Sequence, residues 1–119
     1  ADSTENGPDY KLIALKFEQL MTTEQLYLQH DLRLDSVAQR LGTNRTYLLA
    51  ALKQEAGMTF NEYVNRRRIS NAIRLMESHP DILKTDIAAR SGYNSLSAFY
   101  RNLKNYTNSP AEPTQPEDP

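Results

Sequence analysis

The 119-residue chain contains no cysteine, so it can form neither a disulfide framework nor a thiolate metal site. Its longest purely apolar run, Leu48 to Leu52, is far too short to cross a membrane. No signal peptide is visible at the start. The chain also lacks an initiator methionine, so we expect it to be excised from a longer protein. A cytoplasmic location fits these absences, and they leave open whether the parent protein is anchored in a membrane.

The sequence also lacks the groupings that catalysis and cofactor binding require. The two histidines, His30 and His79, stand alone in predicted connections, which disfavours a metal or catalytic role. The four glycines are dispersed at predicted turns and form no phosphate-binding loop. No nucleophile, base and orienting acid can be assembled. We therefore expect a protein that is not an enzyme and needs no cofactor or metal.

Charge is nearly balanced overall but unevenly distributed. The formal net charge is −1, yet all 14 Lys and Arg residues lie between Lys11 and Lys104. Nine of the 15 acidic residues share that span, which gives it a net charge of +5. A basic centre between acidic ends is compatible with a nucleic-acid surface. An ordinary solvated surface would have the same composition, so charge alone does not decide between them.

One long helix over residues 59–78 organises the chain. Thr59 and Glu62 have the spacing of a capping box, and Pro80 should stop the helix near Ser78. At about 1.5 Å per residue it would span roughly 27–30 Å. Its apolar residues recur at helical spacing: Phe60, Val64, Ile69, Ala72, Ile73 and Met76.

The same pattern, apolar-Ala-x-Arg-x-Gly-x-Asn, occurs on both sides of this helix. The copies are residues 37–44 and 87–94. A short helix, a Gly turn and a polar helix start are what a helix-turn-helix unit requires. After the turn, Leu48, Leu52 and Lys53 correspond to Phe99, Leu103 and Lys104, and we expect Tyr47, Leu48, Phe99 and Leu103 to be core.

No segment alternates like a strand, so the predicted fold is all-α, with two helix-turn-helix subdomains joined by the long linker helix. We expect further helices at about 10–24, 35–41, 44–55, 84–91 and 94–106, the last of them capped by Asn94 or Ser95. Residues 27–32 should form an irregular connection held by Leu28 and Leu32. A final turn could begin at Ser109 and Pro110. The predicted organisation is a linker at 1–9, a first subdomain at 10–58, the linker helix at 59–78, a second subdomain at 79–112 and an acidic, Pro-rich tail at 113–119.

These residues resemble the DNA-binding domain of the AraC/XylS family of bacterial transcription regulators. The resemblance rests on ordered motifs in both halves and the helix between them: Val37-Ala38, Gly42, Tyr47-Leu48, Leu52-Lys53, residues 55–60, Tyr63-Val64, Arg68-Ile69, Ala72, Ile87-Ala88, Gly92-Tyr93, residues 99–101, Leu103-Lys104, Tyr106 and Ser109-Pro110. It implies sequence-specific binding of double-stranded DNA, with the second helix of each unit in adjacent major grooves. It further implies partners in the transcription machinery, such as RNA polymerase, and a sensor or effector module that precedes this fragment. The fragment itself should not contact a membrane.

The resemblance also implies site residues. The groove-facing positions would be Arg45, Thr46, Leu49, Leu96, Ser97, Tyr100 and Arg101, and the phosphate contacts Asn44, Arg66, Arg68, Asn94, Ser95 and Lys104. Arg67, in contrast, is expected on a solvated face. Arg40 and Arg90 could touch phosphate, or pair with the nearby Asp35 and Asp86.

The sequence departs from the family pattern in four ways. Leu49 and Ala50 stand where polar base readers are usual, which keeps open an alternative function as a protein-interaction domain with decayed DNA readout. Arg67 and Lys84 stand where apolar residues are common, and we expect Leu83 to fill the gap at Lys84. Pro113 replaces an aromatic residue and should shorten the last helix.

Overall fold

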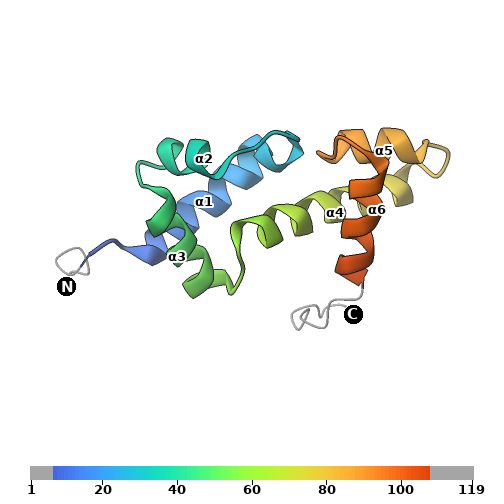
Figure 1. Ribbon diagram of the computed structural model, residues 1–119. Helices are drawn as coiled ribbons and strands as arrows, with labels where there is room; N and C mark the ends of the chain where they lie inside the picture. The colour runs from blue at the N-terminus through green and yellow to red at the C-terminus, as the bar shows by residue number, and fades with distance from the viewer. Residues whose placement is uncertain (1–6, 108–119) are drawn as a thin grey trace.

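The computed structural model describes residues 7–107, and over that range it contains α-helices and one 3₁₀ turn but no strand. The all-α prediction is confirmed. The molecule is elongated, with principal extents of 54 × 31 × 22 Å, and its two helical groups lie toward opposite ends of a central helix (Figure 1). The elements are α1 (Tyr10–Glu24), η2 (Leu26–Leu28), α2 (Leu34–Arg40), α3 (Arg45–Ala56), α4 (Phe60–Ser78), α5 (Lys84–Arg90) and α6 (Leu96–Thr107).

Helix α4 is the predicted linker helix, and its start is fixed by the expected capping box. The hydroxyl of Thr59 accepts a hydrogen bond of 3.1 Å from the backbone N–H of Glu62. In return, the Glu62 carboxylate accepts a bond of 2.9 Å from the N–H of Thr59. Two amide groups that a helix start leaves without partners are thereby satisfied. The helix ends at Ser78, immediately before the His79-Pro80 step.

Two separate hydrophobic cores form on this one helix. Phe60, Tyr63 and Val64 of its first half belong to one core, while Ile69 and Ala72 belong to the other. The first core also contains Phe17, Met21, Leu26, Tyr27, Val37, Ala38, Leu48 and Leu52. The second also contains Ile87, Ala88, Tyr93 and Phe99. The apolar stripe therefore packs against both units, which we call the first and second unit from here on.

The connection after α1 is more regular than predicted. It contains the 3₁₀ turn η2, and its deeply buried residues are Leu26 and Tyr27 rather than Leu28 and Leu32, which are only partly buried. Gln25 adopts the left-handed conformation with φ 50° and reverses the chain just after α1. The reason for the order in this segment is distant in sequence: a side chain of α4 binds two of its carbonyl groups, as described below.

Two packing expectations were wrong. Tyr47 is 39% exposed rather than part of the core. Its ring packs edge-on against the ring of Tyr10, with 6.3 Å between the two ring centroids. Leu83 is 66% exposed and does not fill the gap at Lys84, since it lies just before α5 begins; Ile82 packs partly against the second core instead. The predicted turn at Ser109-Pro110 and the effect of Pro113 lie outside the described residues. Within residues 7–107, no helix is both long and apolar enough to cross a membrane.

Candidate nucleic-acid interface

The two helix-turn-helix units share the same backbone turn. The N–H of Thr43 donates to the carbonyl of Ala38 at 3.0 Å, and the N–H of Tyr93 donates to the carbonyl of Ala88 at the same distance. In both, the preceding glycine has positive φ, 74° at Gly42 and 98° at Gly92. These are the six-to-one bonds of a Schellman helix end, which closes the first helix and redirects the chain. The sequence repeat is therefore a structural repeat.

A polar side chain starts the second helix of each unit. The side-chain oxygen of Asn44 accepts a hydrogen bond of 2.9 Å from the N–H of Tyr47, which caps α3 as predicted. In the second unit, the Ser95 hydroxyl accepts a bond of 3.1 Å from the N–H of Ala98. Ser95 rather than Asn94 is therefore the residue whose side chain satisfies the start of α6.

Each of these second helices buries one face and exposes another. In α3 the buried residues are Leu48, Ala51 and Leu52, and in α6 the buried residue is Phe99. The predicted groove-facing positions that are exposed are Arg45, Thr46, Leu49, Ser97, Tyr100 and Arg101. Leu96 differs, because it is partly buried against the second core. The exposed faces are the ones on which base-reading residues were expected.

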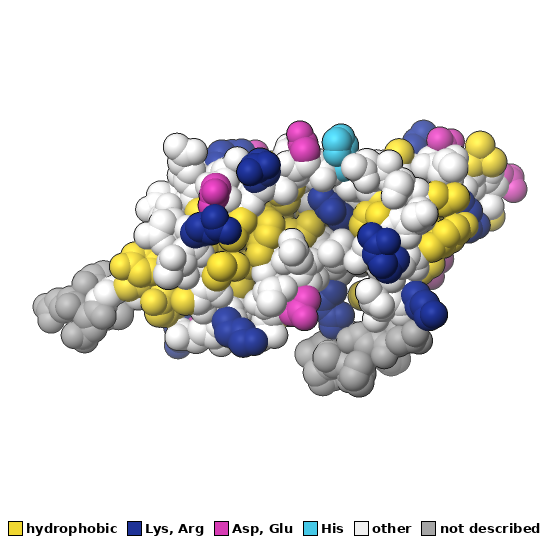
Figure 2. Space-filling view, viewed as in Figure 1, with side chains coloured by type: hydrophobic (Ala, Val, Ile, Leu, Met, Phe, Trp, Pro, Cys, Tyr) yellow, Lys and Arg dark blue, Asp and Glu magenta, His cyan; other side chains and the backbone are white. Residues whose placement is uncertain are grey.

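The arrangement places α3 and α6 at separate ends of the linker helix. Figure 1 shows α3 against α1, ahead of the start of α4, and α6 crossing the second half of α4, with α3 and α6 descending in the same sense in this view. The 19 residues of α4 correspond to a length of about 28 Å. In the same view, Lys and Arg side chains are spread over both units and acidic ones are fewer (Figure 2).

The ion pairs near the start of α3 are not the ones that proximity in the sequence suggested. Arg40 pairs with Glu24, at the end of α1, with 2.7 Å between nitrogen and oxygen. Asp35 instead lies 3.6 Å from Arg45, and both of those side chains are 62% exposed. A pair so exposed contributes little to stability, so Arg45 can exchange this partner for a phosphate or a base at small cost.

The three consecutive arginines of α4 contact three different elements. Arg66 lies over the ring of Tyr106 in α6, 5.6 Å from its centroid. Arg67 reaches α1, where it donates to Glu18 at 3.1 Å and to Thr22 at 3.3 Å. The solvated face expected for Arg67 is therefore wrong, because its guanidinium also stacks 5.1 Å from the ring centroid of Tyr27.

Arg68 lies between the units. Its Nε donates to the carbonyl of Tyr27 at 2.6 Å and its Nη2 to the carbonyl of Gln29 at 2.7 Å. Its guanidinium is 5.5 Å from the ring centroid of Tyr93 in the second unit. Burial lowers the pKa of Arg68, and it raises the pKa of Tyr93 to about 12, an effect that the nearby Arg68 charge partly offsets. The family resemblance implied a phosphate contact for Arg68. No sequence pattern pointed to the two carbonyl groups that it binds, because they lie about 40 residues away.

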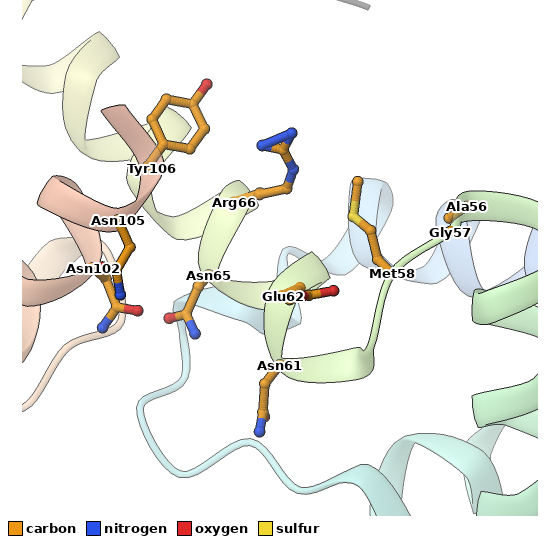
Figure 3. Close-up of a pocket in the computed structure, with 10 residues that line it drawn as sticks. All are labelled: Ala56, Gly57, Met58, Asn61, Glu62, Asn65, Arg66, Asn102, Asn105 and Tyr106. Atoms are coloured by element: carbon orange, nitrogen blue, oxygen red, sulfur yellow. The ribbon is translucent and has the colours of Figure 1, made fainter. Parts of the chain in front are cut away.

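An amide-rich cleft of about 670 Å³ is lined by the end of α3, the first half of α4 and the second half of α6. Figure 3 shows Asn65 of α4 and Asn102 and Asn105 of α6 on its facing sides, with Arg66 and Tyr106 at its upper rim. None of the predicted base-reading residues lines it. The cleft is therefore distinct from the predicted base-reading positions on α3 and α6. Across residues 7–107 no cluster of three or more His, Cys, Asp or Glu side chains could hold a metal ion.

Known proteins with the same pattern are transcription regulators. Residues 37–115 match the family described as helix-turn-helix domain. The protein named probable transcription factor PqrA of Proteus vulgaris is 30% identical over 71% of this chain and 68% of its own length. An uncharacterized HTH-type transcriptional regulator of Staphylococcus aureus strain COL is 28% identical over 77% of this chain, which spans only 12% of that regulator.

The structural likeness extends over most of the chain. The C-terminal domain of AraT, a response regulator from Geobacillus stearothermophilus, has a TM-score of 0.68 and 28% identity, covering 78% of this chain and 74% of that one. Fold, repeated units and sequence thus agree, and the chain belongs to the AraC-type helix-turn-helix family of transcription regulators.

Proposed function

We propose that this chain binds a specific double-stranded DNA sequence, with α3 and α6 in two successive major grooves. The observation that carries the proposal is the pair of structurally repeated units whose second helices turn exposed faces outward from the two halves of one 19-residue helix. Successive major grooves on one side of DNA are about 34–36 Å apart. A linker helix of about 28 Å, plus the lateral reach of a helix at each end, is compatible with that separation.

The two recognition helices would read DNA differently. Arg101 can donate paired hydrogen bonds to O6 and N7 of guanine, and Ser97 and Tyr100 add polar groups on the same exposed face of α6. On α3, Arg45 and Thr46 are polar, but Leu49 can contact only thymine methyl groups or exclude other base edges by shape. Leu96 is partly buried and apolar, so it could contribute only van der Waals contacts to DNA.

Phosphate contacts would come from the starts and flanks of the same helices. Asn44, Asn94 and Ser95 lie at the starts of α3 and α6, where backbone N–H groups favour anions. Lys104 is exposed on α6, and Arg66 lies between α4 and α6. We leave Arg68 out of this set because two of its nitrogens already donate to backbone carbonyl groups.

The wider setting is also a proposal. Because the chain spans 12% of the Staphylococcus aureus regulator, the signal and its sensor module would belong to other parts of a longer protein. As the output domain of such a regulator, this chain would act on chromosomal DNA in the bacterial cytoplasm and contact RNA polymerase or another component of transcription.

A salt titration of duplex binding tests the proposed function. Each phosphate neutralised by a cationic side chain should lower log K by about 0.9 per unit of log salt, so a linear decrease is expected. Lys104→Gln should reduce that slope by about one, with no change in sequence preference. A wild-type chain that fails to bind duplex DNA, or binds it independently of salt, would contradict the proposal and favour a protein-interaction domain, the function that the apolar Leu49 leaves as the second candidate.

A further inference from the structure

The two units touch each other directly, and Arg68 of the linker helix lies at the contact. Gly92 in the turn of the second unit is buried against η2 of the first. A Cβ atom at Gly92 would lie 2.5 Å from the carbonyl oxygen of Tyr27 and 3.2 Å from the Cα of Leu28. Both are backbone atoms, which cannot rotate aside as a side chain can. The φ of 98° independently disfavours any residue other than glycine here.

Arg68 closes this contact from the linker helix. Its two short hydrogen bonds reach the carbonyl groups of Tyr27 and Gln29 in the first unit, and its guanidinium plane covers Tyr93 in the second. Tyr93 is in turn anchored, since its hydroxyl donates a bond of 3.0 Å to Asn65 of α4. One side chain therefore contacts both units at once. The neighbouring Arg67 instead contacts α1, η2 and Tyr63 of α4.

The chemistry of the contact requires arginine. Only the guanidinium fork presents several N–H groups in one rigid plane, so that it can serve two carbonyl groups and stack on an aromatic ring together. Lysine would keep the charge but concentrate its donors on one nitrogen. We call the set of Arg68, Gly92, Tyr93 and the carbonyl groups of Tyr27 and Gln29 the inter-unit clasp.

We propose that the inter-unit clasp determines which spacing of DNA half-sites the protein accepts. This inference rests on the proposed function. Adding one base pair between two half-sites moves them apart along the axis and also rotates one about the other, since a turn takes about 10–10.5 base pairs. Two rigidly joined units cannot follow that rotation, whereas units joined only by α4 could bend to do so. Arg68 is thus a positioning residue for specificity rather than a phosphate contact.

The test is a series of duplexes that carry both half-sites at separations varied by single base pairs around one helical turn. Wild-type protein should lose roughly tenfold or more in affinity when the separation changes by one base pair, comparable to the loss of a half-site contact. Arg68→Met should flatten this profile to within about threefold while its affinity for each isolated half-site stays near that of wild type. Arg68→Lys should give an intermediate profile. Arg67→Met is the matched control: it removes an adjacent positive charge and should leave the profile steep.

A profile for Arg68→Met as steep as that of wild type would overturn the proposal. A uniform loss at every separation, and at isolated half-sites, would do so too, because that is the behaviour of a phosphate contact.

A second measurement examines the clasp without DNA. The chain has no cysteine, so spin labels can be placed at Gln39→Cys in α2 and Ala89→Cys in α5, both exposed positions, for pulsed electron–electron distance measurement. The distance distribution should be narrow in the otherwise wild-type and Arg67→Met proteins and broad in Arg68→Met and Gly92→Ala. An equally narrow distribution in Arg68→Met would refute the clasp. If Arg68→Met gave a broad distribution but the wild-type chain bound no duplex DNA, the clasp would exist and the proposed function would fail. The proposal about half-site spacing would then fail with it.

Discussion

The side-chain amide of Asn71 donates a hydrogen bond of 3.2 Å to the hydroxyl of Ser91, and both residues are buried. The same amide lies 3.4 Å from the carbonyl of Arg90, and the side-chain oxygen of Asn71 accepts a bond from Arg74. A polar residue of the linker helix is thus fully engaged at the edge of the second core. It joins α4 to the turn between α5 and α6, so it helps to fix the position of α6.

We expect Asn71→Ala to lower the free energy of unfolding by about 1–3 kcal/mol, because Ser91 is left buried without its partner. Urea unfolding measures the change, and Ser70→Ala, at an exposed neighbouring position, is the control. In a double-mutant cycle, Asn71→Ala and Ser91→Ala should together cost less than the sum of their separate effects. Strict additivity would show that the bond contributes nothing.

The depth of the second core predicts a difference between two isoleucines of α4. Ile69 is fully buried, whereas Ile73 is only partly buried. Ile69→Ala should destabilise the protein by about 2–5 kcal/mol, and Ile73→Ala by about half as much, since less surface returns to water. Thermal or urea unfolding of the two variants measures both losses of stability. Equal losses would mean that the stripe does not pack as described.

The buried tyrosines predict a loss of stability in alkali. Burial raises the pKa of Tyr93 from 10.0 to about 12, and burial followed by the hydrogen bond to Glu18 raises the pKa of Tyr63 further. An acid whose pKa is raised by folding stabilises the fold fully below pH 10, and this contribution disappears as the pH rises toward 12. For Tyr93 it amounts to about 2–3 kcal/mol.

Tyr93→Phe should therefore lose less stability than wild type between pH 10 and pH 12, although its stability at pH 7 is lowered by the missing bond to Asn65. Urea unfolding at a series of pH values gives both quantities, and Tyr100→Phe, at an exposed position, is the control. If Tyr93→Phe and wild type lost stability in parallel over this range, the assignment of the effect to Tyr93 would be wrong.

Most of the helices could be predicted because their ends are encoded locally. The capping box of Thr59 and Glu62, the Asn44 cap and the positive-φ glycines each act within about five residues, so a short window of sequence contains the whole signal. The apolar stripe of α4 likewise follows from helical spacing within the helix itself. The all-α fold, with one helix serving both halves, was therefore accessible from sequence.

The fates of the arginines could not be predicted in the same way. Arg67 and Arg68 are adjacent in sequence, yet one binds α1 and the other binds η2 and the second unit. Their partners are some 40–50 residues away, and no local periodicity reports a carbonyl group that becomes available only after the units dock. For the same reason Tyr27 and Gly92 gave no sign of the inter-unit contact. The exposure of Tyr47 was not predicted either. Its ring meets Tyr10, 37 residues earlier in the chain, only edge-on and stays 39% exposed.

The exposed faces of α3 and α6 predict unequal half-sites. Arg101→Ala should cost about 1–3 kcal/mol in DNA binding and relax the preference for guanine at one position, because a bidentate contact is lost. Leu49→Ala, at a position that can offer only apolar contact, should have a smaller effect confined to the other half-site. Competition binding with single-base variants of the site measures both. An unchanged preference in Arg101→Ala would contradict the assigned role.

Selection of bound duplexes from a random DNA pool tests whether α3 and α6 read two unequal half-sites. We expect an enriched site with two elements about one helical turn apart, one sharply defined and containing guanine, the other loose and rich in A·T pairs. A single enriched element, two elements of equal information, or no enrichment over the starting pool would contradict it.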